Sequence, residues 1–139
     1  MKFKFFCFLF AIYIAIGNCK DQKNVNNEPL EVCSLSPMTG YTRTGKCETN
    51  EWDQGTHLVC ARVNDKFLKY TKAKGNDLST PRSWFPGLKD GDNWCLCVFR
   101  WVQAYRDGFG PSVVLNATNK EALNYLKQFG VGLKDISKN

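Results

Sequence analysis

The apolar positions of this chain form one uninterrupted run at the start and short, separated groups afterwards. The run covers 5–16, FFCFLFAIYIAI, and follows a basic start at Lys2 and Lys4. A membrane-spanning helix needs about 20 apolar residues, so this run is too short for one. A basic start, a short apolar stretch and small residues after it are typical of a secretory signal peptide, which we expect over residues 1–19.

The residues after the apolar run fit cleavage after either Gly17 or Cys19. An uncleaved anchor is the alternative. A lipid-bearing Cys19 is disfavoured, because Asn18 rather than a small residue precedes it. We expect the polar residues 20–28 to be a flexible lead-in and residues 29–139 to form a single globular domain without a membrane span.

Alternation and helical spacing begin only after a loop-rich segment over residues 35–55, which is rich in Pro, Gly, Thr and Asn. The β-branched, half-alternating stretch 57–63 predicts a strand. Apolar positions then recur at helical spacing up to Gly75, and Asn64 or Asp65 can cap that helix.

The same patterns continue to the end of the chain. They predict a strand over 93–99, a helix over 101–107, a strand over 111–115, a helix from 118 to about 130 and a short helix over 133–137. Thr118 followed by Glu121 has the spacing of a capping box at the start of the helix predicted from residue 118. The order predicts an α+β fold, a small sheet with helices packed on one side, with an α/β arrangement as the alternative.

The charge balance is mildly basic, with 19 Lys+Arg against 13 Asp+Glu and a formal net charge of +6. Loss of Lys2 and Lys4 with the signal leaves +4. The densest basic stretch, 66–74, falls on a predicted helix and is typical of a solvated face. Because the tryptophans of the chain have no basic residues interleaved with them, we expect no nucleic-acid partner. No glycine-rich phosphate loop is present.

Five of the seven cysteines lie in the expected domain: Cys33, Cys47, Cys60, Cys95 and Cys97. A secretory route permits disulfides. An odd number leaves at least one thiol free unless Cys19 pairs with it. Strand alternation places Cys95 and Cys97 on one face, about 6.5–7 Å apart, which disfavours a bond between them.

The single histidine, His57, lies three residues before Cys60. His57, Cys60, Cys95 and Cys97 together would make a Cys3His set suitable for zinc. A regular strand would place His57 and Cys60 on opposite faces, which counts against this set. The alternatives are small buried thiols with a disulfide, or a thiol-redox role with Arg62 or Arg100 as the activating cation.

A base with an orienting carboxylate is also available, since Asp53 lies four residues before His57. With Cys60 or Cys95 as nucleophile, these residues would form a Cys/His catalytic scheme, and Cys97 is a further candidate. No local signature of a known protease or transferase surrounds these cysteines.

The stretch 75–92 is a long loop, and loops of this length are often functional. We expect recognition loops around the strand ends, made of Asn76, Asp77, Ser79, Thr80, Arg82, Trp84, Asp90, Asp92 and Trp94. The alternative for the first four is a helix-exit turn in which they bond to backbone. Asn116-Ala117-Thr118 is a glycosylation sequon.

Four long stretches together resemble one known family: CSLSPMTGYTRTGKC, GNDLSTP, FPGLKDGDNWCLC and FRWVQAYRDGFGPSVVLNAT. The chain is identified as a member of the family called domain of unknown function 2237 (DUF2237), small and mainly bacterial proteins, over about residues 24–137. The resemblance implies no established activity and no catalytic residues. Typical members are plain intracellular proteins, so this chain differs from them by its signal peptide.

These observations favour an uncharacterised secreted or endomembrane domain that serves as a binding or structural module. The alternative is a thiol-redox or metal-dependent enzyme built on cysteine and histidine. We expect a small-molecule or protein ligand, a location outside the cell or in the endomembrane lumen, and no certain cofactor, with zinc as the candidate.

Overall fold

A computed structural model describes residues 21–138. The expected signal peptide, both cleavage sites, Cys7 and Cys19 lie outside the described residues. The elements are β1 (His57–Arg62), α1 (Asp65–Ala73), β2 (Asn93–Cys97), α2 (Val98–Arg106), β3 (Ser112–Val113), the 3-10 helix η1 (Leu115–Ala117), α3 (Ala122–Gln128) and α4 (Leu133–Ile136). The three strands form an antiparallel sheet in the order β2-β1-β3.

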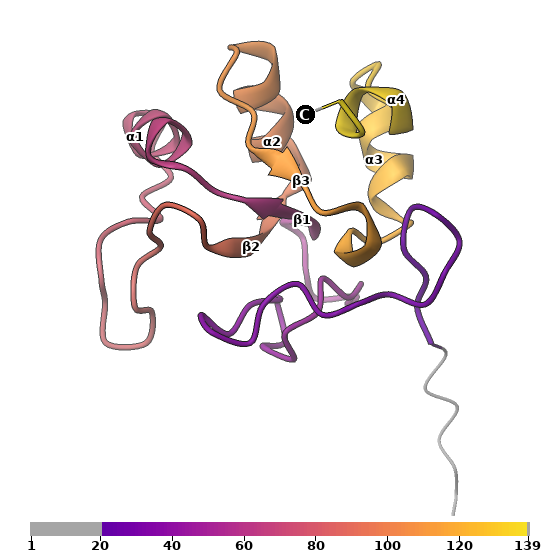
Figure 1. Cartoon of the computed structure of the whole chain (residues 1–139), viewed down its shortest axis with the longest axis horizontal. Coiled ribbons are helices and arrows are strands. Elements are labelled where there is room, and N and C mark those ends of the chain that lie inside the picture. Colours follow the sequence, from indigo (N-terminus) through magenta and orange to yellow (C-terminus); the bar gives the residue numbers. More distant parts are fainter. Residues whose placement is uncertain (1–20, 139) are drawn as a thin grey trace, which may run out of the picture.

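The sheet lies between a layer of helices and a layer of loops. Figure 1 shows the helices on one side of the strands and the N-terminal loops, drawn in indigo to magenta, on the other. The main apolar core, which includes Val59, Phe67, Leu96 and Trp101, fills the helix side. Antiparallel strands with helices on one side confirm the α+β prediction and exclude the α/β alternative.

Helix α1 begins and ends where its sequence predicts. The Asn64 side chain accepts a hydrogen bond from the Phe67 backbone N–H at 2.8 Å, so Asn64 is the cap. Gly75 follows the helix with a φ of +88°, the left-handed conformation that glycine adopts without strain. Phe67, Leu68 and Thr71 form the buried face.

Helix α2 begins at Val98, directly after β2, so the predicted strand over 93–99 is two residues too long. Val98, Trp101 and Val102 are buried at helical spacing, while Phe99 is exposed. Burying this stripe outweighs the strand-like alternation that Phe99 continues. The predicted strand over 111–115 is also shorter and covers only Ser112–Val113.

The predicted capping box at Thr118 is wrong. Thr118 is fully buried, and its hydroxyl accepts from the Cys60 backbone N–H at 3.1 Å and donates to the Val114 carbonyl at 2.9 Å. Helix α3 starts only at Ala122. The hydroxyl is used by the neighbouring strand β1, because a buried N–H without a partner costs more than a missing helix cap.

Residues 21–28, expected to be a flexible lead-in, pack against the domain. Asn24 is fully buried, and its side-chain amide donates to the Asn116 carbonyl at 3.0 Å. Val25 is buried too, and its N–H donates to the Thr118 carbonyl at 3.0 Å. The segment therefore belongs to the fold.

A β-bulge changes the face on which the histidine lies. Cys60 is paired with Cys95 and Val59 with Leu96, but His57 is paired with Cys97, so β1 carries one extra residue, Leu58, within this part of the ladder. Directly paired residues share a face of the sheet. The bulge therefore brings His57 to the cysteine face, whereas regular alternation would place it opposite Cys60.

Two disulfides connect the loop layer to the sheet. Cys33 is bonded to Cys60 on β1, and Cys47 to Cys95 on β2. All four residues are buried and pack with Ala117 in a second, smaller core. The loops predicted over residues 35–55 are thereby fixed to the strands, although they contain no helix or strand of their own.

Candidate functional site

The structure brings the four expected zinc ligands to one face, but not as ligands. Cys60 and Cys95 are in disulfides, so neither offers a thiolate, and only His57 and Cys97 remain of the set. The sulfurs of Cys33, Cys47 and Cys60 lie within 4.8 Å of one another, close enough to share an ion, yet all three are oxidised. A zinc site is not formed by this arrangement.

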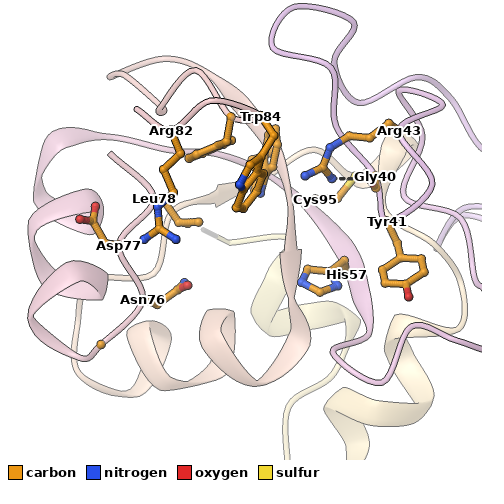
Figure 2. Close-up of a pocket in the computed structure, with 13 residues that line it drawn as sticks. Gly40, Tyr41, Arg43, His57, Asn76, Asp77, Leu78, Arg82, Trp84 and Cys95 are labelled. Carbon is orange, nitrogen blue, oxygen red and sulfur yellow. Dashed lines mark hydrogen bonds between the residues drawn. The ribbon is translucent and has the colours of Figure 1, made fainter. Parts of the chain in front are cut away.

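A cleft of about 460 Å³ opens beside the disulfides. The loop that carries Gly40, Tyr41 and Arg43 forms one wall, and the long loop from Gly75 to Phe85 forms the other. Figure 2 shows Arg43 and His57 on one side of this space and Asn76, Leu78 and Arg82 on the opposite side. Residues far apart in the sequence thus face each other, because the Cys47–Cys95 disulfide holds the first loop against β2.

Two arginines stand over tryptophan rings at this cleft. The Arg43 guanidinium lies 5.1 Å from the centre of the Trp94 ring, and that of Arg82 lies 6.0 Å from the Trp84 ring. The Arg43 guanidinium also donates to the Gly40 carbonyl at 2.6 Å. Within residues 21–138 neither guanidinium has a carboxylate within 4.0 Å. Both positive charges are therefore available to an anion.

Asp77 shapes the long loop rather than presenting its charge. Its Oδ1 accepts from the backbone N–H groups of Ser79 and Thr80 at 3.1 and 3.0 Å, and its Oδ2 accepts from the Thr80 hydroxyl at 2.6 Å. Lys72 lies 3.6 Å away. The Thr80 hydroxyl, first among these contacts, holds the Asp77 pKa far below its ordinary value. Of the helix-exit turn considered from the sequence, only the Asp77 side chain bonds to backbone, whereas the side chains of Asn76, Ser79 and Thr80 bond to other side chains.

Asn76 and the two other loop aspartates also have defined structural roles. The Asn76 amide donates to the Thr71 hydroxyl at 3.1 Å. Asp90 accepts from the Asp65 backbone N–H at 3.1 Å at the start of α1. Asp92 accepts from the Lys89 N–H at 2.8 Å. Asp90 and Asp92 hold turns and do not line the cleft.

His57 and Asp53 form the pair that their spacing predicts. The Nδ1 atom of His57 lies 2.7 Å from Oδ1 of Asp53, while Oδ2 accepts from the His57 backbone N–H at 2.8 Å. The Asp53 side chain is 2% exposed and that of His57 is 40% exposed. Because an ionised carboxylate only accepts, this contact requires the proton on Nδ1, and in a neutral imidazole Nε2 is then the acceptor.

A second hollow of about 230 Å³ adjoins the cleft and shares His57 and Asn76 with it. Cys97 and Arg100 line its far end. Gly55 lies under the imidazole, and a Cβ at this position would be 2.5 Å from the His57 Cε1. Only glycine leaves room for the ring in this place.

The sequence found one wall of the cleft and missed the other. Of the nine predicted recognition residues, Asn76, Asp77, Arg82, Trp84 and Trp94 line it, and Ser79 and Thr80 fold onto Asp77. Tyr41 and Arg43 were missed, because the sequence does not specify the pairing of the Cys47–Cys95 disulfide that holds their loop against β2. Asn116 is exposed, and its glycosylation stays a prediction.

Among curated proteins none matches this chain. Within the described residues no helix combines the length and the apolar character needed to cross a bilayer. Residues 23–131 match the family described as "Uncharacterized protein conserved in bacteria (DUF2237)". This range is most of the chain and contains both walls of the cleft, both disulfides and the His57–Asp53 pair. The chain therefore belongs to the DUF2237 family.

Proposed function

We propose that this domain is a binding module whose cleft takes a small anionic ligand with a flat apolar part. The observation that carries the proposal is the pair of guanidiniums, Arg43 and Arg82, which face one cleft without carboxylate partners among residues 21–138. A planar guanidinium binds carboxylate or phosphate through two parallel hydrogen bonds. Two of them on opposite walls favour an anion between them.

The size and lining of the cleft support the flat apolar part. A volume of about 460 Å³ is within the range of small-molecule sites. Trp84, Phe85 and Trp94 contribute aromatic surface, and Trp84 is 69% exposed. An exposed aromatic at a cleft mouth covers a flat ligand at low cost in conformational entropy. A neutral aromatic would use only this half of the site.

The compartment proposed is extracellular or lumenal. Two buried disulfides persist in oxidising compartments, in agreement with the signal peptide expected over 1–19. N-terminal sequencing of the secreted protein should begin after Gly17 or Cys19. A mature chain that retains Met1 would contradict cleavage.

The binding proposal is tested by titrating the mature protein with phenyl phosphate and, as a neutral comparison, benzyl alcohol, followed by amide chemical shifts. We expect shifts in both walls and at least tenfold tighter binding of phenyl phosphate. Arg43→Ala and Arg82→Ala should each weaken it about tenfold or more, since a hydrogen bond to a charged group contributes about 1.5–3 kcal/mol.

Lys127→Ala is the matched control, because it removes one positive charge from an exposed position on α3 outside the cleft. Its affinity should equal that of the wild type. Equal affinities for the two probes, or an equal loss in Lys127→Ala and Arg82→Ala, would refute specific anion recognition in the cleft.

A further inference from the structure

The bulge in β1 creates a pairing that the regular strand pattern does not predict. His57 and Cys97 are direct partners in the β1–β2 ladder, and side chains at such positions share a face with Cβ atoms about 4.5–5.5 Å apart. Both residues line the hollow of about 230 Å³. An imidazole and a thiol therefore line one hollow beside the cleft.

Cys97 differs from the other cysteines of the described segment. Cys33, Cys47, Cys60 and Cys95 are buried in disulfides, whereas Cys97 is a free thiol of intermediate exposure. A small molecule in the hollow can reach it. Since disulfide sulfur is not a nucleophile, Cys97 is the one that remains of the three candidate nucleophiles considered from the sequence.

The base is already oriented. Asp53 holds Nδ1 of His57 at 2.7 Å, and the ring rests over Gly55, so both the tautomer and the plane of the imidazole are set. The remaining nitrogen, Nε2, accepts a proton in this tautomer. A nucleophile, a base beside it and a third group that orients the base are the three parts of a thiol relay.

We propose that Cys97, His57 and Asp53 form a nucleophilic site that attacks the carbonyl carbon of an ester or thioester. The substrate class rests on the proposed function: the acyl group carries the anion that Arg43 and Arg82 hold. The Cys97 Sγ and the imidazole are not hydrogen-bonded to each other in the structure. Such contacts commonly tighten only when the substrate is bound.

The reaction balances without an oxidant or metal. The Cys97 Sγ forms a bond to the carbonyl carbon, its proton passes to Nε2 of His57, and the bond from carbon to the leaving group breaks as the leaving group takes that proton. Water then gives a proton to Nε2 of His57 and its oxygen bonds to the thioester carbon. The bond from that carbon to Sγ breaks, and Sγ takes the proton back from His57 as the acid is released. The sum is hydrolysis of one acyl bond by one water molecule.

The test is acylation of the mature, disulfide-bonded protein by 4-nitrophenyl acetate, followed by nitrophenolate release and by peptide mapping of the acyl group. We expect about one equivalent in a burst, with the acetyl group on Cys97. His57→Ala and His57→Gln should slow the burst at least tenfold, Asp53→Asn less, and Cys97→Ser should abolish it. Near-UV circular dichroism verifies that each variant is folded.

The pH profile separates a base from a merely structural histidine. The wild-type rate should show a pH-dependent step that comes from the imidazole acting as a base, and this step should be missing in His57→Gln. The titratable and charged side chains that line the two hollows with His57 and Cys97, or bond to His57, are Tyr41, Arg43, Asp53, Asp77, Arg82 and Arg100. Identical profiles for wild type and His57→Gln, or a burst that persists in Cys97→Ser, would overturn the proposal.

The acetyl ester is neutral, so its reaction does not require the two arginines. Acylation of Cys97 in the wild type, together with phenyl phosphate binding that Arg82→Ala loses and Lys127→Ala keeps, would support both proposals. A burst without specific anion binding in the wild type would refute the binding function and keep the nucleophile. Specific binding of the anion without acylation of Cys97 would refute the nucleophile and keep the binding function.

Discussion

Asp77 shows how one carboxylate determines the shape of a cleft wall. It accepts from two backbone N–H groups and from the Thr80 hydroxyl, and it lies 3.6 Å from Lys72. These contacts depress its pKa below the ordinary 3.8, the Thr80 hydroxyl first. The charged form therefore belongs to the folded loop, and its effect on stability depends on pH.

Acid should remove the contribution of Asp77 selectively. A depressed pKa in the folded state stabilises the fold fully above the ordinary pKa and loses that effect as the pH falls below about 4. At pH 7, Asp77→Asn should therefore unfold at a lower temperature than the wild type, and the gap should shrink as the pH falls towards 2. Calorimetry at pH 7, 4 and 2 measures this difference in unfolding temperature.

The pKa values of Asp107 and Asp135 are also lowered. Because both groups are present in the wild type and in Asp77→Asn, their contributions to the pH dependence of stability cancel in the comparison. Burial first, and then the hydrogen bond to Asp107, raises the pKa of Tyr70 to about 12, which lies outside the pH range of this test. A gap that stays constant from pH 7 to pH 2 would show that the Asp77 charge contributes nothing.

At the scale of elements, the short helix α1 depends on its first turn. Asn64 satisfies the Phe67 N–H at 2.8 Å, and Asp65 adds a negative charge at the positive end of the helix. Asn64→Ala should lower the free energy of unfolding by about 1 kcal/mol, as for caps of this type. Denaturant unfolding checks it, with Lys66→Ala, an exposed position of the same helix, as the control; equal stability of the two variants would contradict a capping role.

Elements whose signals are local could be predicted, and those set by a partner could not. Asn64 and Gly75 act within their own helix, so the bounds of α1 follow from the sequence. Thr118 has the same kind of local signal, but β1 needs its hydroxyl, and a single sequence does not show which strand will lie beside it. The helix therefore starts later than predicted.

The candidate site divides in the same way. The four-residue spacing of Asp53 and His57 is local, and their bond was predicted. The pairing of His57 with Cys97 depends on a bulge that exists only when β1 meets β2. Alternation along one strand gave the wrong face for His57. The sequence also does not specify the disulfides that remove Cys60 and Cys95 as candidate nucleophiles.

At the scale of the whole molecule, the two disulfides replace the secondary structure that the N-terminal loops lack. They join residues 27 and 48 positions apart, and their loops interleave, since Cys47 lies between Cys33 and Cys60 in the chain. Closing loops of these lengths restricts the unfolded chain by about 3.5 and about 4 kcal/mol when each is taken alone. Because they overlap, the two values do not add.

Removal of the Cys47–Cys95 bond should therefore affect both stability and the cleft. The double variant Cys47→Ala/Cys95→Ala should lose about 3–4 kcal/mol of unfolding free energy in denaturant. It should also bind phenyl phosphate more weakly, since the loop that carries Tyr41 and Arg43 is no longer fixed to β2 beside Trp94. Cys97→Ala is the matched control, because it removes a sulfur from the same strand without opening a loop. If both variants unfolded at the same denaturant concentration, the disulfide would not stabilise the fold. If the double variant still bound phenyl phosphate with the affinity of the wild type, Arg43 would not need the disulfide to reach the cleft.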